Sequence, residues 1–266
     1  MERTATAGRT ATSSPAAPPE APLTDPAGLL DGVPAQRGAA APATVPAAPV
    51  EPAPEVFPPR AARPARLPLP TPAGTPFTFG YALVLAATSL VGWYVGPAVA
   101  HALHQASSTD VAHLVRDPLL VLPASALWIV GGPVSTYALL FLVVLTALER
   151  RIGGLRAAGV FLLGHVLATL ATEVPVGLAV LAGRLPESSL HRLDYGISFG
   201  VAASVGAMAG LLPVWLRWPL LMVYGGLLVQ DLITFTDPMT DYGHLLALTI
   251  GAATWPLVRR WHRERA

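Results

Sequence analysis

Long apolar runs recur along the chain from Phe77 onward, and they constrain its fold more than any other feature of the sequence. A helix needs about 20 consecutive apolar residues to cross the hydrocarbon core of a bilayer. Short charged or Pro- and Gly-containing breaks separate the runs, which predicts membrane-spanning helices joined by short loops. The predicted spans are residues 79–100, 123–148, 157–182, 195–216, 218–230 and 242–258.

Composition supports a membrane location and excludes several classes of function. Charged residues make up 12% of the chain, against about 25% in an ordinary soluble domain. The formal net charge of +1 gives no electrostatic basis for binding nucleic acid. The chain has no cysteine, which excludes disulfides, thiolate metal sites and a cysteine nucleophile. We therefore expect the lipid bilayer and other membrane proteins as partners, no nucleic acid, and no metal or cofactor.

Composition also divides the chain into three parts. Residues 1–76 are rich in Pro and Ala and contain no long apolar run, so they cannot bury enough apolar area to offset the entropy of ordering them. We expect them to form a disordered cytoplasmic tail. Residues 77–258 are expected to form an all-α membrane domain of six helices, and residues 259–266 a basic cytoplasmic C-terminus.

Arginine placement predicts the orientation of the spans, because short loops rich in Arg or Lys tend to stay in the cytoplasm. The loops expected on the inner side contain most of the arginines: Arg60, Arg63, Arg66, Arg150, Arg151, Arg156, Arg217, Arg259, Arg260, Arg263 and Arg265. The outer loops contain Arg116, Arg184 and Arg192. This asymmetry predicts a multi-pass protein of the cell membrane with both termini in the cytoplasm.

The first outer loop contains a helix-start signal. Asp110 is a favourable N-cap residue, and Val111, Leu114 and Val115 follow it at helical spacing. The pattern predicts a short helix, which either lies at the membrane interface or is an ordinary capped loop helix.

A serine and a histidine lie at the outer ends of the fourth and sixth predicted spans. Both spans open with Asp-Tyr-Gly, at residues 194–196 and 241–243, and Ser198 and His244 follow about one turn inside. A neutral imidazole within hydrogen-bond reach can take the proton of a serine hydroxyl that attacks a carbonyl carbon. The two residues are a candidate catalytic pair, while packing and hydrogen bonding are the ordinary roles of such residues in polytopic proteins.

Small residues accompany both positions. Gly196, Gly200 and Ser204 recur at every fourth position of the fourth span, and Ala247 and Gly251 follow the histidine of the sixth. Such spacing lets two helix backbones approach closely. We therefore expect the fourth and sixth spans to be neighbours, as a contact between the serine and the histidine requires.

The third predicted span carries a polar stripe. His165, Thr169, Thr172 and Glu173 share one helical face, which we expect to point into the bundle. One interpretation is a hydrogen-bond network between helices. A second is that Glu173 orients His244 or stabilises an oxyanion, and a third is an ion or proton pathway.

These features resemble the rhomboid family of intramembrane serine proteases. Gly196-Ile197-Ser198 is similar to the family's Gly-x-Ser motif at the start of the fourth helix, and His244 is similar to the histidine at the top of the sixth. Residues 148–153, Leu-Glu-Arg-Arg-Ile-Gly, resemble the segment that ends the family's second helix. The resemblance covers residues 77–258 and implies a six-helix rhomboid-like bundle.

The resemblance also implies roles for individual residues. Ser198 would be the nucleophile, with its backbone amide in the oxyanion hole, and His244 would be the general base. Residues 131–137 lack the family's His-x-x-x-Asn pair, which helps to stabilise the oxyanion, and Phe199 replaces the usual small residue after the serine. The oxyanion or supporting candidates are Gly196, His165, Thr169 and Glu173.

Three functions are consistent with this pattern. The first is a rhomboid-like serine endopeptidase that cleaves membrane-anchored substrates near their outer ends. The second, motivated by the missing His-x-x-x-Asn pair, is a catalytically inactive rhomboid-like protein that binds client helices. The third is a small transporter that uses His165 and Glu173.

Overall fold

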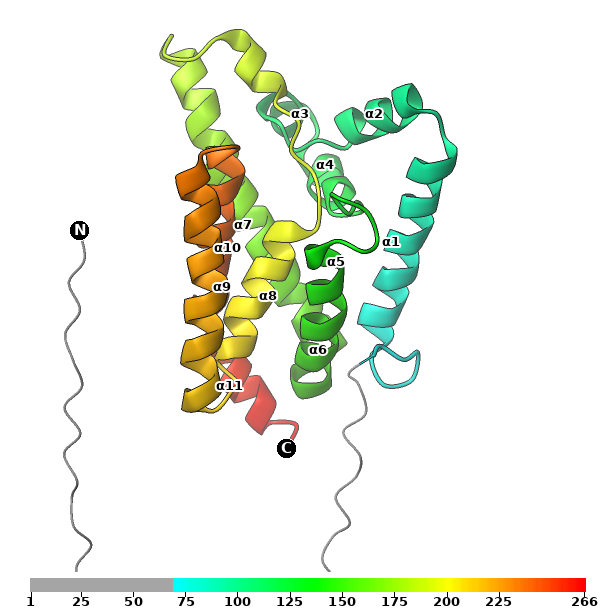
Figure 1. Ribbon diagram of the computed structural model, residues 1–266, viewed down its shortest axis with the longest axis vertical. Helices are drawn as coiled ribbons and strands as arrows, with labels where there is room; N and C mark the ends of the chain where they lie inside the picture. The colour runs from blue at the N-terminus through cyan, green and yellow to red at the C-terminus, as the bar shows by residue number, and fades with distance from the viewer. Residues whose placement is uncertain (1–68) are drawn as a thin grey trace, which may run out of the picture. The chain divides into compact units, whose positions relative to one another are not determined.

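The computed structural model describes residues 69–266, which contain helices and no strand. The expected tail, residues 1–76, lies outside the described residues except for residues 69–76. The α-helices, shown in Figure 1, are α1 (Pro76–Tyr94), α2 (Pro97–Ala106), α3 (Val111–Arg116), α4 (Pro118–Ser125), α5 (Thr136–Leu140), α6 (Thr146–Ile152), α7 (Gly154–Leu181), α8 (Ser198–Ala209), α9 (Val214–Thr234), α10 (Pro238–Ala253) and α11 (Trp255–Arg263). A π-helical segment, η2 (Phe141–Leu145), joins α5 to α6, and a 3-10 helix, η3 (Glu187–His191), precedes α8.

The second predicted span, residues 123–148, is wrong as a single helix. Helix α4 ends at Ser125, and the next helical residue is Thr136. Between them Gly131 and Gly132 have φ values of 79° and 82°, a left-handed conformation that glycine adopts without steric cost. Hydropathy cannot register such a turn, because the residues around it remain apolar.

Other predicted boundaries also shift. The first predicted span ends early, since α1 stops at Tyr94 and the chain begins α2 at Pro97. The sixth starts earlier than expected, at Pro238, and a separate helix, α11, follows it. The short helix expected after Asp110 is confirmed, because α3 begins at Val111 and the Asp110 carboxylate accepts the amide of His113 at 3.0 Å.

Helix α8 is the centre of the described fold (Figure 1). Every residue from Phe199 to Ala209 is buried, and most of them have small side chains. Helices α7 and α10 pack against it, so α8 contacts protein on all of its faces. Because α8 packs against protein on its faces, its surface can consist of small residues, whereas a span that faces lipid presents large apolar side chains.

Backbone contact between α8 and α10 is close enough to require glycine. A Cβ atom on Gly251 would lie 1.9 Å from the carbonyl oxygen of Ala203, and one on Gly206 would lie 2.2 Å from that of Leu248. The prediction that these two spans are neighbours is confirmed. Gly200, in contrast, faces the ring of Phe161 on α7.

The segment Leu148–Gly153 holds the start of α1. The buried carboxylate of Glu149 accepts the amides of Phe77 at 3.0 Å and Thr78 at 2.7 Å, and the hydroxyl of Thr78 at 2.6 Å. It thereby satisfies backbone donors that the first turn of a helix leaves unpaired. Gly153, at φ 93°, makes the turn from α6 into α7.

Two arginines close the other end of α8. Arg217 donates to the carbonyl oxygens of Ala209 at 3.0 Å and Leu212 at 2.9 Å, and Arg259 donates to that of Gly210 at 2.9 Å. Each guanidinium lies 5.1 Å from the ring centroid of a tryptophan on α11, within cation–π range. These cations therefore pair the last carbonyls of α8 and lie at the negative end of its dipole.

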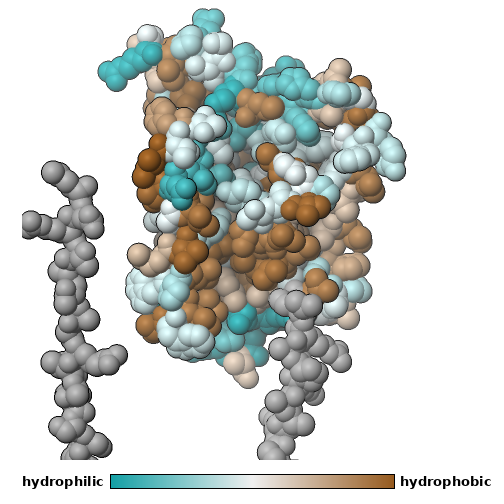
Figure 2. Space-filling model, in the orientation of Figure 1, coloured by the Kyte–Doolittle hydropathy of each residue, from teal (hydrophilic) through white to brown (hydrophobic). Residues whose placement is uncertain are grey.

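Among the described residues, α1 and α7 are long and apolar enough to cross a membrane. Helix α8 has 12 residues and α10 has 16, both below the usual spanning length of about 20. Figure 2 shows apolar residues across the middle of one face, with hydrophilic residues toward its two ends. This pattern is typical of a protein whose middle lies in lipid and whose ends lie in water.

Candidate functional site

Ser198 is the first residue of α8, at the end of a non-helical loop. The amide of Gly196 donates to the carbonyl oxygen of Ser125 at 2.8 Å, and that of Ile197 donates to Trp128 at 3.1 Å. Gly196 has φ 124°, and a Cβ there would lie 3.0 Å from the side chain of Val130. The glycine of the Gly-x-Ser motif is thus required by backbone geometry, because it lets the chain turn sharply into the helix.

The first turn of α8 offers unpaired backbone donors. Helical hydrogen bonding begins when the amide of Val201 donates to the carbonyl oxygen of Ile197 at 3.0 Å. The amides of residues 198–200 therefore have no acceptor in their own helix. They lie at the positive end of the helix dipole, an arrangement suited to binding a negatively charged oxygen.

His244 is enclosed by aromatic rings. It lies almost two turns into α10 and is buried. Its ring stacks on Tyr137 at a centroid distance of 5.2 Å and meets Phe199 edge-on at 5.2 Å. Neither ring nitrogen has a hydrogen-bond partner among residues 69–266.

Ser198 and His244 are not hydrogen-bonded to each other, since neither ring nitrogen of His244 has a partner among the residues that the structure describes. Phe199, the residue after the serine, contacts the histidine ring, so the start of α8 and the upper part of α10 are adjacent. The expectation that both residues lie about one turn inside their helices is wrong, because α8 begins at Ser198 and α10 begins six residues before His244. The crossing of the two helices nevertheless brings Phe199, the residue after the serine, into contact with the histidine ring.

His165 belongs to a separate polar group. Its Nε2 atom lies 3.0 Å from the hydroxyl of Ser125 and 3.0 Å from the carbonyl oxygen of Leu122, both on α4. Its ring stacks with Phe161 at 6.4 Å. Thr169, one turn further along α7, is buried, and its hydroxyl has no partner among the described residues. These contacts tie α7 to α4.

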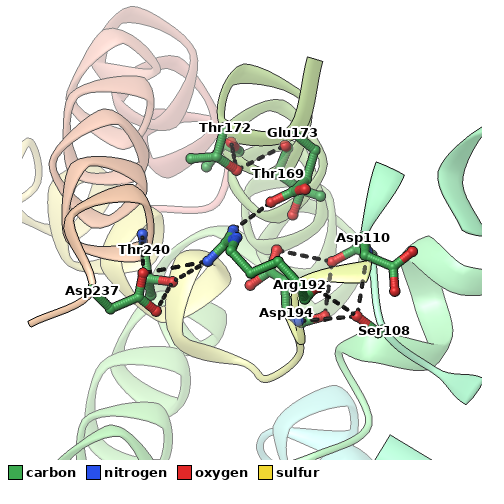
Figure 3. A network of polar contacts seen from close by, with 11 residues as sticks. Ser108, Asp110, Thr169, Thr172, Glu173, Arg192, Asp194, Asp237 and Thr240 are labelled. Atoms are coloured by element: carbon green, nitrogen blue, oxygen red, sulfur yellow. Dashed lines mark hydrogen bonds and ion pairs between the residues drawn. The ribbon is translucent and has the colours of Figure 1, made fainter. Parts of the chain in front are cut away.

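Glu173 pairs with an arginine that sequence reasoning missed. Its carboxylate is buried and forms an ion pair with Arg192, which comes from the loop before α8 (Figure 3). The same guanidinium reaches Asp237 at 3.4 Å and the hydroxyl of Thr240 at 3.1 Å, at the start of α10. A signal was present, because a buried carboxylate needs a counter-charge and Arg192 is one of three arginines in the predicted outer loops.

Burial and neighbouring charges shift the pKa values of two residues in this loop, Arg192 and Asp194. Burial, the largest single effect, lowers the pKa of Arg192, but the negative charges of Glu173, Asp194 and Asp237 together outweigh it, so the pKa is raised. Burial raises the pKa of Asp194, although Arg192 and a hydrogen bond from Thr109 at 3.0 Å oppose the rise. The arginine therefore stays charged at any ordinary pH.

The stretch from Gly131 to Tyr137 supplies an aromatic ring to the site. Ser135 caps α5 by accepting the amide of Ala138 at 3.3 Å, and Tyr137 stacks on His244.

Within residues 69–266, no group of three or more His, Cys, Asp or Glu side chains is placed to hold a metal ion.

Comparison with known proteins gives one match. A family model described as a rhomboid-like protein matches residues 73–264, which is more than half of the chain. No curated protein and no solved structure matches it.

Proposed function

The chain belongs to the rhomboid-like family of membrane-embedded proteins, and from this premise we propose that it is an intramembrane serine protease. It cleaves membrane-anchored substrates near their outer ends, with Ser198 as the nucleophile and His244 as the general base. One observation supports the proposal: Phe199, the residue that follows the serine, packs against the ring of His244.

The chemistry follows from this arrangement. The Ser198 hydroxyl attacks the carbonyl carbon of the scissile peptide while neutral His244 takes its proton. The first-turn amides of α8 bind the oxyanion of the tetrahedral intermediate. His244 then protonates the leaving amine, and water, activated by the same imidazole, hydrolyses the acyl-enzyme.

Substrate binding has to complete this pair. Within residues 69–266 His244 has no hydrogen-bond partner, and its ring contacts those of Tyr137 and Phe199, so we infer that a side-chain rotation brings the serine hydroxyl and the imidazole together. Catalytic hydrogen bonds are often long or unformed before the substrate binds. Loss of one oxyanion donor costs about 100- to 1000-fold in rate, so the missing His-x-x-x-Asn pair predicts slow turnover.

Six spans, with both termini in the cytoplasm, are part of the same proposal. The arginines expected on the inner side include those that cap the lower end of α8 and those of α11, whereas Arg192 lies at the opposite end of α8. The rod of α5, η2 and α6 supplies the second span, and α8 a short fourth span sheltered by its neighbours. The active site then faces outward, where water is available.

Labelling with a fluorophosphonate tests the nucleophile. We expect the parent protein to be labelled, and we expect Ser198→Ala and His244→Ala each to abolish labelling and cleavage of a model membrane substrate. Ser204→Ala, in the same helix, and His191→Ala, at the exposed end of η3, are matched controls that keep both activities. Retained labelling of Ser198→Ala overturns the assignment.

A second candidate function is client binding without hydrolysis. It is favoured by the imidazole of His244, which has no hydrogen-bond partner in the described part of the chain, and by the absence of His and Asn from residues 131–137. Photo-crosslinking to a client helix that survives Ser198→Ala, together with no turnover by the parent, supports it.

The transporter hypothesis has no such support, because Glu173 is ion-paired to Arg192 and His165 is hydrogen-bonded to α4.

A further inference from the structure

The side chain of Arg192 joins three elements around the candidate site. One Nη atom is ion-paired with Glu173 on α7, and the other lies 3.4 Å from Asp237 and 3.1 Å from the hydroxyl of Thr240 (Figure 3). Arg192 itself begins the loop that ends at Ser198. Its guanidinium is a planar fork of donors, which suits it to hold two carboxylates at once.

Other contacts hold the rest of this loop, and they lead away from α10. The backbone amide of Asp194 donates to the hydroxyl of Ser108 at 3.0 Å, and the hydroxyl of Thr109 donates to the Asp194 carboxylate at 3.0 Å. Gly196 and Ile197 donate to the segment after α4. The hydrogen bonds that join the loop to α10 come from Arg192.

The partners on α10 belong to its first turn. Asp237 is the N-cap residue and accepts the amide of Thr240 at 3.4 Å and its hydroxyl at 2.8 Å. Thr240 lies one helical turn before His244, on the same side of the helix. Whatever fixes this turn also fixes the height and rotation at which the histidine enters the site.

We propose that Arg192 is a positioning residue that sets the distance between Ser198 and His244 by bridging α7 to the first turn of α10. The bridge is a property of the fold, and its effect on turnover rests on the proposed function. Glu173 fixes the guanidinium from the buried side, because it pairs with one Nη atom while Asp237 contacts the other. A lysine ammonium is a single compact charge and cannot hold both carboxylates in this geometry.

Pulsed electron paramagnetic resonance tests the bridge without reference to activity. The full chain has no cysteine, so spin labels at Leu193→Cys and Tyr242→Cys, both exposed positions, report the distance between the loop and α10. We expect one narrow distance distribution in the otherwise unchanged protein, a broadened and shifted one with Arg192→Ala, and an intermediate one with Arg192→Lys. Arg184→Ala, an exposed arginine after α7, is the matched control and leaves the distribution narrow.

Turnover measurements on the unlabelled variants test the catalytic consequence. A misplacement of about 1 Å costs about 100-fold, so Arg192→Ala lowers kcat by about that factor with KM unchanged, and Arg192→Lys recovers part of the loss. Asp237→Asn, at a half-exposed position, lowers kcat less because Thr240 and Glu173 remain. A merely structural role would instead lower the folded fraction and leave the kcat of the folded protein unchanged.

The outcomes separate the two proposals. An unchanged distance distribution in Arg192→Ala overturns the bridge, whatever the activity. A broadened distribution with unchanged kcat overturns the positioning role. Absence of turnover in the parent, with a broadened distribution in Arg192→Ala, overturns the proposed protease and supports the bridge as a feature of the fold.

Discussion

At the scale of single residues, the most informative feature of the sequence is the occurrence of polar side chains within apolar helices. The cost of burying a carboxylate or imidazole made Glu173 and His165 recognisable from the sequence as residues with a structural or functional task. Their partners could not be singled out from the sequence, because Arg192 is one of three arginines in the predicted outer loops and Ser125 lies 40 positions before His165. The sequence could predict that a partner exists, while the fold decides which one it is.

Glu149 makes a testable prediction at this scale. Glu149→Gln keeps the size of the side chain but replaces one acceptor oxygen with a donor that faces the start of α1, so at least one of its three hydrogen bonds is lost. We expect a loss of about 2 kcal/mol in the free energy of unfolding. Unfolding in mixed micelles, followed by circular dichroism, measures it. Glu187→Gln, at an exposed position in η3, is the control, and equal stability of the two variants contradicts the prediction.

At the scale of single helices, the sequence predicted the helical class correctly, but several of the predicted helix boundaries were wrong. The all-helical class and the third span were predicted closely, since α7 covers Gly154–Leu181 against an expected 157–182. The second span failed because a glycine turn interrupts an apolar run. The fourth began late because Gly196 turns the chain and the loop before it is held by other segments.

Contact between α8 and α10 gives a prediction at the scale of elements. Gly251→Ala places a Cβ 1.9 Å from a carbonyl oxygen of α8, and backbone cannot move aside as a flexible side chain can. We expect the helices to separate, with a loss of about 3 kcal/mol in the free energy of unfolding.

The matched control is Gly226→Ala in α9. A Cβ there meets nothing within 4 Å. Alanine is the better helix former by about 1 kcal/mol, so this variant is expected to be as stable as the parent or more so. Unfolding in mixed micelles compares the two variants, and a Gly251→Ala protein as stable as Gly226→Ala would contradict the close approach.

At the scale of the whole molecule, the family and the neighbourhood of the fourth and sixth spans followed from the sequence. Small residues predicted that neighbourhood, because they leave room for two backbones. The central position of α8 did not follow, since hydropathy treats a helix inside protein and a helix in lipid alike. The hydrogen-bonded contact expected between Ser198 and His244 depends on side-chain rotations, which no sequence pattern specifies.

Orientation in the membrane is the prediction that belongs to this scale. Single cysteines at Ser188 and Phe235 are expected to react with a membrane-impermeant maleimide in intact cells. Cysteines at Arg150 and Ala266 are expected to react only after permeabilisation, since the arginine asymmetry places them inside. The chain has no cysteine of its own, so the parent is the blank. Reaction of Ala266→Cys in intact cells would contradict the predicted cytoplasmic location of the C-terminus.

The burial of α8 on every side has a consequence for how the protein is made. Twelve residues are too few for α8 to remain in a bilayer by itself, and the carbonyl groups at its C-terminal end are paired by Arg217 and Arg259, which follow it in the chain. Helix α10, which forms one of its walls, is synthesised after it. Until α10 leaves the ribosome, α8 therefore needs another partner to cover the face that α10 later occupies, and the core closes only after α10 has been synthesised.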